Sequence, residues 1–314
     1  MKKKVLSLVL TSAMVMAMMS GCGAEKETVY KVGVIQQMQH DALDAANEGF
    51  IQALDDAGIP YEVDQQNAAG ETSSYVTIAD KFVNDDVDLI LAIATNAAQA
   101  VAGATSDIPI LGTAITDYET AGLVASNDAP GGNVSGTSDM NPIDVQLELI
   151  STLVPDAETL CVFYSSDEDN SILQADLFEE AAVAQGFAVE RYTISNTNEI
   201  ETVMQSMEGK VDAVYIPTDN KLAAAMPTVG MLAEEMLLPV FCGEGNMVTS
   251  GGLATYGLDY YELGYTTGEM AVEVLVNGAD TATMPITYLP TERFELIVNE
   301  DMAEALGIDL SVLE

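Results

Sequence analysis

The 314-residue chain contains no tryptophan and a single histidine, His40, which limits the chemistry it can perform. A nucleophilic catalytic set needs a nucleophile, a base and a group that orients the base, and one histidine without partners does not provide it. A zinc site of the usual kind needs a cluster of Cys and His ligands, which the sequence also lacks. Walker and GxGxxG phosphate-binding patterns are absent. We therefore expect no catalytic residues, no metal site and no cofactor.

Basic residues are scarce as well: ten Lys and Arg stand against 50 Asp and Glu, for a net charge of -40. Such a chain repels nucleic acid and anionic lipid headgroups, so nucleic-acid binding is excluded. Any attachment to a membrane must therefore come from something other than charge. The acidity itself is a solubility property that suits an exported protein, and it does not indicate metal binding.

The first of only three cysteines, Cys22, closes what reads as a signal peptide. MKKK is a basic start, VLSLVLTSAMVMAMM is an apolar run too short for a confident membrane span, and Ser20-Gly21 supplies small residues before the cut. The site resembles a bacterial lipobox, with Met19 in place of the usual leucine. We predict removal of residues 1–21, a lipid anchor on Cys22, and a linker over 22–30. Ordinary secretion with a chance cysteine is the alternative.

The other two cysteines, Cys161 and Cys242, lie in the apolar runs LCVFY and LPVFC. Both runs read as buried strands, first and fourth in sequence within one sheet. In a doubly wound sheet of order 2-1-3-4-5 these strands are not neighbours. We therefore expect two small buried side chains and no disulfide.

From residue 30 onward an apolar run, a turn and an amphipathic helix alternate, and this rhythm occurs twice. It predicts two α/β lobes, each a doubly wound parallel sheet covered by helices. Expected strands are 32–35, 61–65, 89–94, 110–113 and 123–125, then 160–164, 188–193, 213–216, 239–242 and 254–256. Expected helices include 41–57, 72–84, 96–105, 144–153, 171–185, 198–207, 221–236 and 261–276.

Between the two halves, DAPGGNVSGTSDMNP (128–142) reads as a connection because glycine, proline and small polar residues dominate it. We place the chain crossings between lobes near 127–141, 257–259 and 290–294. The first lobe would then comprise 31–127 and 260–290, and the second 128–259 and 291–314.

In such sheets, ligands bind beyond the carboxyl ends of the strands, where helix N-termini present free N–H groups. Two lobes that face each other form a cleft there, lined by the loops that follow each strand. These loops carry amides, hydroxyls and acids suited to hydrogen-bonding a small polar molecule. The candidate ligand-binding residues are Gln37, His40, Asp41, Thr95, Asn96, Thr113, Ala114, Ser138, Asp139, Ser165, Asn170, Ser171, Asp219, Asn220 and Glu244.

Four segments resemble the ABC transporter substrate-binding lipoprotein family, whose characterised members bind aromatic amino acids. They are YEVDQQNAAGETSSYVTIADKFVNDDVDLILAIATNAAQA (61–100), PGGNVSGTSDMNPIDVQLELI (130–150), GKVDAVYIPTDNKLAAAMPTV (209–229) and GGLATYGLDYYELGYTTGEMA (251–271). The resemblance implies a type I periplasmic-binding fold with a three-crossing hinge that closes on its ligand. It also implies a permease and an ATPase as partners, and we expect a monomer anchored to the outer face of the bacterial cytoplasmic membrane.

For an amino-acid ligand, Thr95, Asn96, Thr113 and Ala114 are candidates for the carboxylate, because hydroxyls and amides at helix starts favour anions. Simple N-capping is the alternative for these residues.

For the ammonium group, the candidates are Asp219 and Glu244, unless both are solvated surface acids. Asn170, Ser171 and Asn220 would bond the polar end of the ligand from the other side. Ser138 and Asp139 are hinge or cleft residues.

His40 is interpreted either as a ligand contact or as a cap of the helix that follows it. The family often has proline after this histidine, and here Asp41 stands in that place. Its carboxylate could change the ligand preference. Tyr118, Tyr164 and Met38 are candidates for apolar walls.

Two other functions remain open at this point. An extracytoplasmic receptor that senses a ligand for a signalling partner would have the same fold, and a sugar or nucleoside could replace the amino acid. Enzymatic turnover is a third option, disfavoured by the missing catalytic set.

Overall fold

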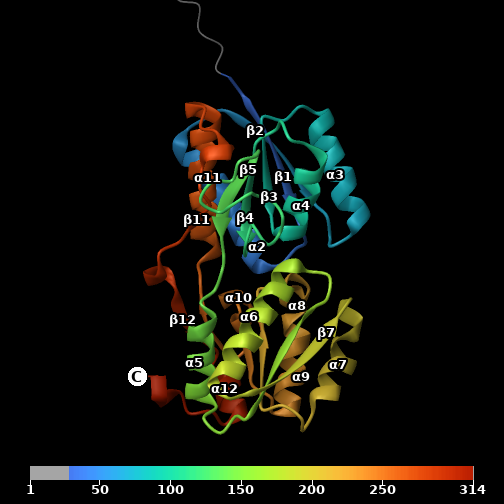
Figure 1. Cartoon of the computed structure of the whole chain (residues 1–314), viewed down its shortest axis with the longest axis vertical. Helices are drawn as coiled ribbons and strands as arrows, with labels where there is room; N and C mark the ends of the chain where they lie inside the picture. Colours follow the sequence, from blue (N-terminus) through green and yellow to red (C-terminus); the bar gives the residue numbers. More distant parts are fainter. Residues whose placement is uncertain (1–27, 314) are drawn as a thin grey trace, which may run out of the picture.

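The computed structural model describes residues 28–313. The predicted signal peptide and the lipid-anchor site Cys22 lie outside the described residues. Within the described part, no helix is both long and apolar enough to span a membrane. The chain forms two lobes stacked along the long axis of the molecule (Figure 1). Each lobe holds one six-stranded sheet with helices on both faces, so the predicted fold class is confirmed.

The sheet of the first lobe has the order β11-β5-β4-β3-β1-β2, and all its strand pairs are parallel. Helices α2 and α11 pack on one face of it, and α3 and α4 pack on the other. The elements of this lobe are β1 (Tyr30–Gln36), α2 (Asp41–Ala57), β2 (Tyr61–Asn67), α3 (Thr72–Asn84), β3 (Leu89–Ile93), α4 (Thr95–Ala104), β4 (Ile110–Ile115), β5 (Val134–Ser138), α11 (Tyr260–Asn277), the 3-10 turn Thr281–Thr283 and β11 (Thr287–Tyr288).

The sheet of the second lobe has the order β12-β10-β9-β8-β6-β7, parallel except for the antiparallel edge strand β12. Cys161 on β6 and Cys242 on β9 are buried, and β8 lies between their strands. The elements are α5 (Ile143–Leu153), β6 (Thr159–Ser165), α6 (Asp169–Gln185), β7 (Ala188–Ile194), the 3-10 turn Thr197–Glu199, α7 (Ile200–Met207), β8 (Ala213–Ile216), α8 (Asn220–Ala224), α9 (Met226–Met236), β9 (Val240–Cys242), α10 (Gly245–Thr249), β10 (Ala254–Gly257), β12 (Glu295–Val298), α12 (Glu300–Leu306) and the 3-10 turn Leu310–Leu313.

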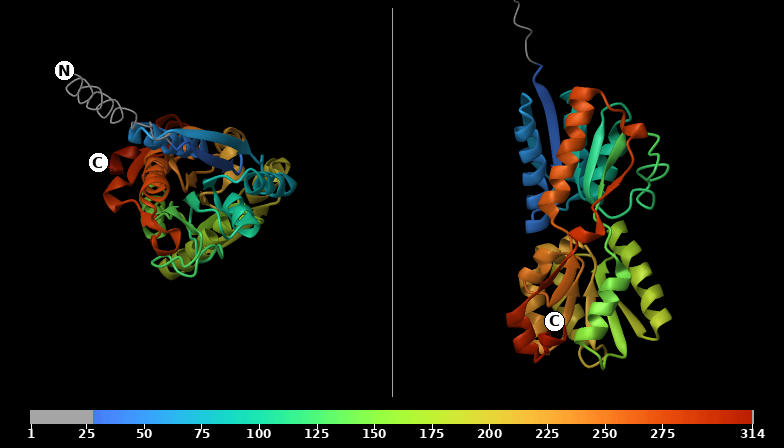
Figure 2. Two further views of the ribbon diagram at one scale, coloured as in Figure 1. Left: turned by 90° about the horizontal axis from the view of Figure 1, so that it is seen from above. Right: turned by 90° about the vertical axis from the view of Figure 1, so that its left-hand side faces the viewer.

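Three segments cross between the lobes on one side of the molecule: 139–142, 258–259 and 289–294 (Figure 2). The third contains the 3-10 turn Thr291–Arg293. The first crossing is shorter than the sequence indicated. Residues 128–138 were assigned to a connection and to the second lobe, and this was wrong, because β5 is a buried strand of the first lobe.

Close packing explains why β5 is rich in glycine and hydroxyl residues that are typical of a connection. A Cβ at Gly136 would overlap the backbone oxygen of Gly112 on β4, so no larger residue fits there. Ser135 donates to the Met284 carbonyl at 2.7 Å, and the Thr137 hydroxyl bonds that of Thr267 at 2.8 Å. Small and hydroxyl side chains therefore fill this strand, where sequence reading expects large apolar ones.

Two further element predictions differ from the structure. Residues 123–125 form no strand, and β5 takes the place in the sheet that they were expected to fill. The helix predicted over 221–236 is two helices that meet at Ala225, because Pro227 starts a new helix in its first turn.

Helices α2 and α11 approach each other closely, because glycine occupies both sides of the contact. A Cβ on Gly264 would overlap the carbonyl oxygen of Ala46, and one on Gly49 would overlap that of Tyr261. This contact joins segments more than 200 residues apart. Through it α11, which follows the second lobe in the sequence, packs in the first lobe.

We predict that Gly264→Ala lowers the free energy of unfolding by about 2 kcal/mol, because helix backbones must separate to admit the methyl group. Gly103→Ala on α4 is the control, since a Cβ there meets nothing within 4 Å and alanine favours helix. Urea denaturation of both variants measures the difference. Equal stability of the two variants would contradict the close packing.

Candidate functional site

The carboxyl ends of both sheets face each other, and hydrogen bonds cross the cleft between them. His40 Nε2 lies 3.2 Å from Asn220 Oδ1, the hydroxyls of Thr116 and Thr218 are 3.3 Å apart, and Gln99 donates to Asp169 at 2.9 Å. Gln174 of α6 donates to the hydroxyl of Thr116 at 3.3 Å. The lobes are therefore closed on each other. Thr116, Thr218 and Gln174 are buried between them, whereas Asp169 lies exposed at the edge.

On the side of the first lobe, the loops after β3 and β4 have an unusual backbone. Ala94 and Ala114 both adopt positive φ, 78° and 55°, although neither is glycine. Such strain persists where function or surrounding structure requires it, and left-handed residues turn successive N–H groups toward an anion. Thr95 starts α4 beside Ala94 and is buried, and its hydroxyl has no hydrogen-bond partner in the described part of the chain.

On the side of the second lobe, Asp219 organises the loops. Its carboxylate accepts from the Ser165 amide and hydroxyl, the Ser171 hydroxyl and the Leu222 amide, at 2.6–2.9 Å. Both oxygens are therefore already used within the lobe. Glu168, fully buried, accepts from the backbone and side-chain N–H groups of Asn220 at 3.1 and 2.6 Å.

Asn170 is held with its amide oxygen free. Its Nδ2 donates to the Thr218 carbonyl at 2.8 Å, and because that carbonyl requires a donor, the orientation of the amide is fixed. Its Oδ1 is buried and has no partner among the described residues.

At the hinge, Asp139 on the first crossing accepts a hydrogen bond from the hydroxyl of Tyr260, the first residue of α11, at 2.8 Å. This bond uses Oδ2 only; Oδ1 is buried and unpartnered within the described chain. Asn141 on the same crossing donates to the Gly243 carbonyl of the second lobe and leaves its own Oδ1 without a partner. Ser138 donates to the Thr116 carbonyl at 2.7 Å and so shapes the loop after β4.

Buried polar atoms in proteins nearly always have hydrogen-bond partners, so a group of exceptions in one place calls for an explanation. Six of the eight such atoms in the described chain belong to residues of the cleft and hinge or of the strand that leads to them. These are His40 Nδ1, Thr95 Oγ1, Asp139 Oδ1, Asn141 Oδ1, Asn170 Oδ1 and Tyr215 Oη. This arrangement fits a closed site in which a small molecule would supply the missing hydrogen-bond partners.

Burial also shifts the protonation of the site. It raises the pKa of Asp139 above its usual value, raises that of Glu168 to about 8 with the help of nearby Asp219, and raises that of Glu244 to about 7. Burial lowers the pKa of His40, so the ring is neutral. No group of three or more His, Cys, Asp or Glu side chains within residues 28–313 is arranged to hold a metal ion.

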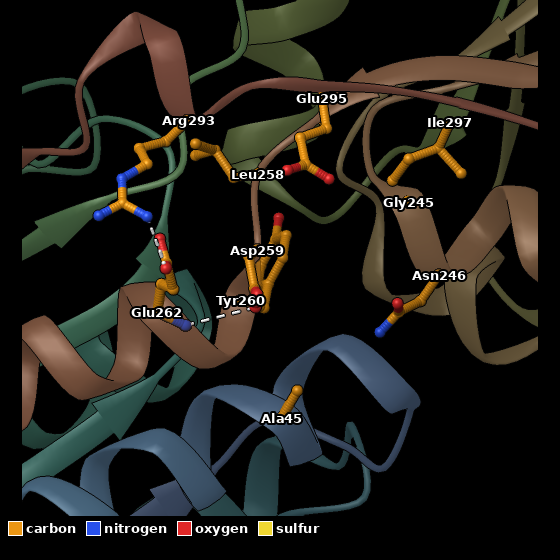
Figure 3. A pocket seen from close by; sticks show the side chains of 11 residues that line it. Ala45, Gly245, Asn246, Leu258, Asp259, Tyr260, Glu262, Arg293, Glu295 and Ile297 are labelled. Atoms are coloured by element: carbon orange, nitrogen blue, oxygen red, sulfur yellow. Dashed lines mark hydrogen bonds and ion pairs between the residues drawn. The ribbon is translucent and has the colours of Figure 1, made fainter.

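Two hollows open at the edge of the cleft. One, of about 240 Å³, is a mouth between α2 and the second lobe, lined by Gln39, His40, Asp41, Glu244 and Asn246 among others. The other, of about 300 Å³, lies beside the hinge, where Arg293 on the third crossing reaches Glu262 on α11 at 2.8 Å (Figure 3). Neither hollow is lined by Asp139, Asn141 or Asn170.

Most sequence-predicted residues come to the cleft, although not all face its interior. Thr113 points into the first lobe, where its hydroxyl accepts from Thr137 at 3.2 Å. Ser165 and Ser171 bond Asp219 instead of facing the cleft, and Asp41 is exposed at the mouth. Gln37 accepts from the amide of Asn96 at 3.1 Å and fixes the start of α4. Tyr118 and Tyr164 belong to the lobe cores and form no cleft wall.

The prediction missed several residues of the cleft: Thr116, Asn141, Glu168, Gln174 and Thr218. Four of these lie in the same loops or crossing as predicted residues, and nothing in the sequence separates them from their neighbours. Gln174 lies one helical turn after Asn170, on the same face of α6, and that spacing was the available signal.

Comparison with known proteins shows one family over almost the whole chain. The sequence profile described as ABC transporter substrate binding protein matches residues 31–312. A protein of Clostridioides difficile named tyrosine-binding protein is 41% identical over 323 residues, which cover 98% of this chain and 93% of that protein.

Two solved structures differ in how well they superpose on the structure of this chain. A Streptococcus pneumoniae ABC domain in complex with L-Trp is 38% identical, with TM-score 0.87, covering 91% of this chain and 98% of that one. A ligand-free, open substrate-binding protein of Clostridium difficile is 43% identical, yet its TM-score is 0.69, with 90% and 96% covered. The more identical relative superposes less well, so the lobe arrangement here resembles the ligand complex.

The raised pKa of Glu244 leads to a pH-dependent prediction. An acid whose pKa rises on folding, here from 4.5 to about 7, stabilises the fold below pH 4.5 relative to higher pH, and this contribution is lost as the pH rises to 7. Glu244→Gln keeps an acceptor for the Asn246 amide and removes the titration. We expect this variant to gain up to about 3 kcal/mol relative to the native chain between pH 4.5 and 8. Urea denaturation across this range measures it, and parallel pH profiles would contradict it.

Proposed function

Since the chain belongs to the ABC transporter substrate-binding protein family, we propose that it captures a free aromatic amino acid in the cleft between its lobes. It would deliver this ligand to a permease driven by an ATPase, from the outer face of the membrane, held there by a lipid on Cys22. The family is one of binding proteins, which agrees with a single histidine and no nucleophile paired to it.

The unpartnered polar atoms of the cleft and hinge are the observation that carries the proposal. Asp139 Oδ1, Asn141 Oδ1 and Asn170 Oδ1 are acceptors, and an ammonium group has three N–H donors. Their surroundings are continuous: Asp139 adjoins Thr116, which bonds Thr218, whose carbonyl holds Asn170. We assign the ammonium to these acceptors and not to Asp219, whose oxygens already have four donors.

The carboxylate of the ligand belongs at the opposite, donor-rich side. The Thr95 hydroxyl has no partner in the described chain, α4 begins at that residue, and the left-handed Ala94 and Ala114 shape the loops beside it. A helix N-terminus favours negative charge. A molecule with a cation at one end and an anion at the other matches this division, whereas a sugar or a nucleoside carries neither.

An aromatic side chain is supported by the relatives, one named for tyrosine and one solved with L-Trp. Asp41, where the family often has proline, lies exposed at the mouth and away from the unpartnered atoms of the hinge. We therefore propose that it leaves the recognition of the α-amino and carboxyl groups intact.

We predict that free tyrosine, tryptophan or phenylalanine at 100 times its dissociation constant stabilises the full chain by about 2.7 kcal/mol, raising the melting temperature by roughly 5 °C. Tyramine lacks the carboxylate and N-acetyltyrosine lacks the ammonium, so each should shift the melting temperature far less. Differential scanning fluorimetry gives the comparison. Shifts by these derivatives equal to that of tyrosine would argue against recognition of a zwitterion.

The role of Asp139 is tested by Asp139→Asn, which still accepts the Tyr260 hydroxyl but carries no charge. We expect the dissociation constant of the amino acid to rise about 100-fold, because a buried charge-assisted bond is lost. Asp144→Asn, at an exposed position of α5, removes the same charge away from the cleft and serves as control. Isothermal titration calorimetry measures both, and equal affinities would refute the assignment.

A further inference from the structure

His40 bonds across the cleft with one ring nitrogen, and its other ring nitrogen has no partner in the described chain. It precedes α2 as the N-cap residue, with extended backbone (φ -161°, ψ 163°), yet its ring makes no capping hydrogen bond. Its backbone carbonyl closes the first helical turn instead, and the ring reaches across the cleft to Asn220. The capping interpretation of this histidine is therefore wrong for the side chain.

The position of the proton on the ring follows from its partner. Asn220 uses Nδ2 to donate to Glu168 at 2.6 Å, so its Oδ1 faces His40 as an acceptor. His40 must therefore donate from Nε2. Burial keeps the ring neutral, although Asp44, Asp41 and Asp219 act in the opposite direction. A neutral ring protonated on Nε2 carries a lone pair on Nδ1.

That lone pair has no donor in the closed structure. Nδ1 is buried and has no hydrogen-bond partner within residues 28–313. An unsatisfied buried acceptor is unfavourable, because it has lost its hydrogen bonds to water and gained no donor in return. Closure of the lobes without a ligand thus forms the bond to Asn220 but leaves Nδ1 unsatisfied, and an open cleft would give Nδ1 water.

We propose that His40 couples ligand binding to lobe closure, taking a hydrogen bond from an N–H or O–H of the ligand at Nδ1 while donating from Nε2 to Asn220. This inference rests on the proposed function, and it adds a specificity requirement: the ligand must present a donor to this nitrogen. In an aromatic amino acid the donor is either a polar atom of the ring or the α-ammonium group, which would then give up one of the three acceptors assigned to it above.

Two amide substitutions separate the two nitrogens. In His40→Gln the amide reaches the position of Nε2, so it can bond Asn220 but offers no acceptor at Nδ1. In His40→Asn the amide oxygen lies at the position of Nδ1, and nothing reaches Asn220. Gln52→Ala, exposed on the same helix, is the matched control.

Calorimetry with tyrosine and phenylalanine identifies the donor. If it is the ring hydroxyl, His40→Gln should weaken tyrosine about tenfold and bind phenylalanine at least as tightly as the native chain does; if it is the ammonium, both should weaken about tenfold. Small-angle X-ray scattering of the unliganded proteins reports closure. His40→Gln should be more closed than the native chain, and His40→Asn at least as open.

Unchanged affinity of His40→Gln for both amino acids would overturn the coupling, as would equal affinity losses in the two variants without any change in unliganded closure. These results leave the proposed function standing, because the native chain still binds. Failure of the native chain to bind any aromatic amino acid would instead reject the proposed function. The scattering comparison then still decides whether the unsatisfied Nδ1 opposes closure.

Discussion

The constraint on which this structure depends is that closing two lobes buries polar loops face to face. Each loop follows a parallel strand and holds side chains and amides that water would otherwise satisfy. Many find partners across the cleft, as Thr116 and Thr218 do. Others, such as Asp139 Oδ1 and Asn170 Oδ1, find none within the described chain. Closing the cleft therefore carries a desolvation cost at these atoms, which the proposed ligand would offset by supplying their missing partners.

Contacts at the hinge connect the buried loops of the cleft to the crossings and to helices of the first lobe. Asp139 lies on the first crossing and Tyr260 begins the helix after the second, so their hydrogen bond ties two crossings together at the floor of the cleft. Arg293 on the third crossing pairs with Glu262, two residues after Tyr260. Helix α11 is in turn fixed to α2 by close glycine contacts, and α2 begins beside His40. Groups to which we assign the ligand are thus connected to the segments that set the angle between the lobes.

The sequence was sufficient for the fold class, the order of strands and the loops that would form the cleft, because hydrophobic periodicity and the parallel-sheet rule act locally. It failed for β5, where backbone approach at Gly112 and Gly136 replaces large apolar side chains with small ones. Within the cleft it placed Asp139 and Asn170 correctly in space. It did not distinguish them from Asp219, whose carboxylate oxygens already accept hydrogen bonds from donors within the second lobe. Whether a carboxylate is free or satisfied depends on neighbours from distant segments, and no spacing along one chain encodes that.

For the zwitterionic ligand proposed above, the buried acids give a physical reason why a chain of net charge -40 would bind the ammonium group and not stay closed without it. Burial raises the pKa of Asp139, because it disfavours the ionised carboxylate more than the hydroxyl bond from Tyr260 favours it. Without a ligand the closed state must either bind a proton there or bear an uncompensated charge, and both oppose closure near neutral pH. A ligand ammonium would remove this penalty. Because the open state has no such buried site, the ammonium would bind the closed state more tightly and so favour closure. In this proposal the same carboxylate both selects the charge of the ligand and opposes closure of the lobes when no ligand is bound.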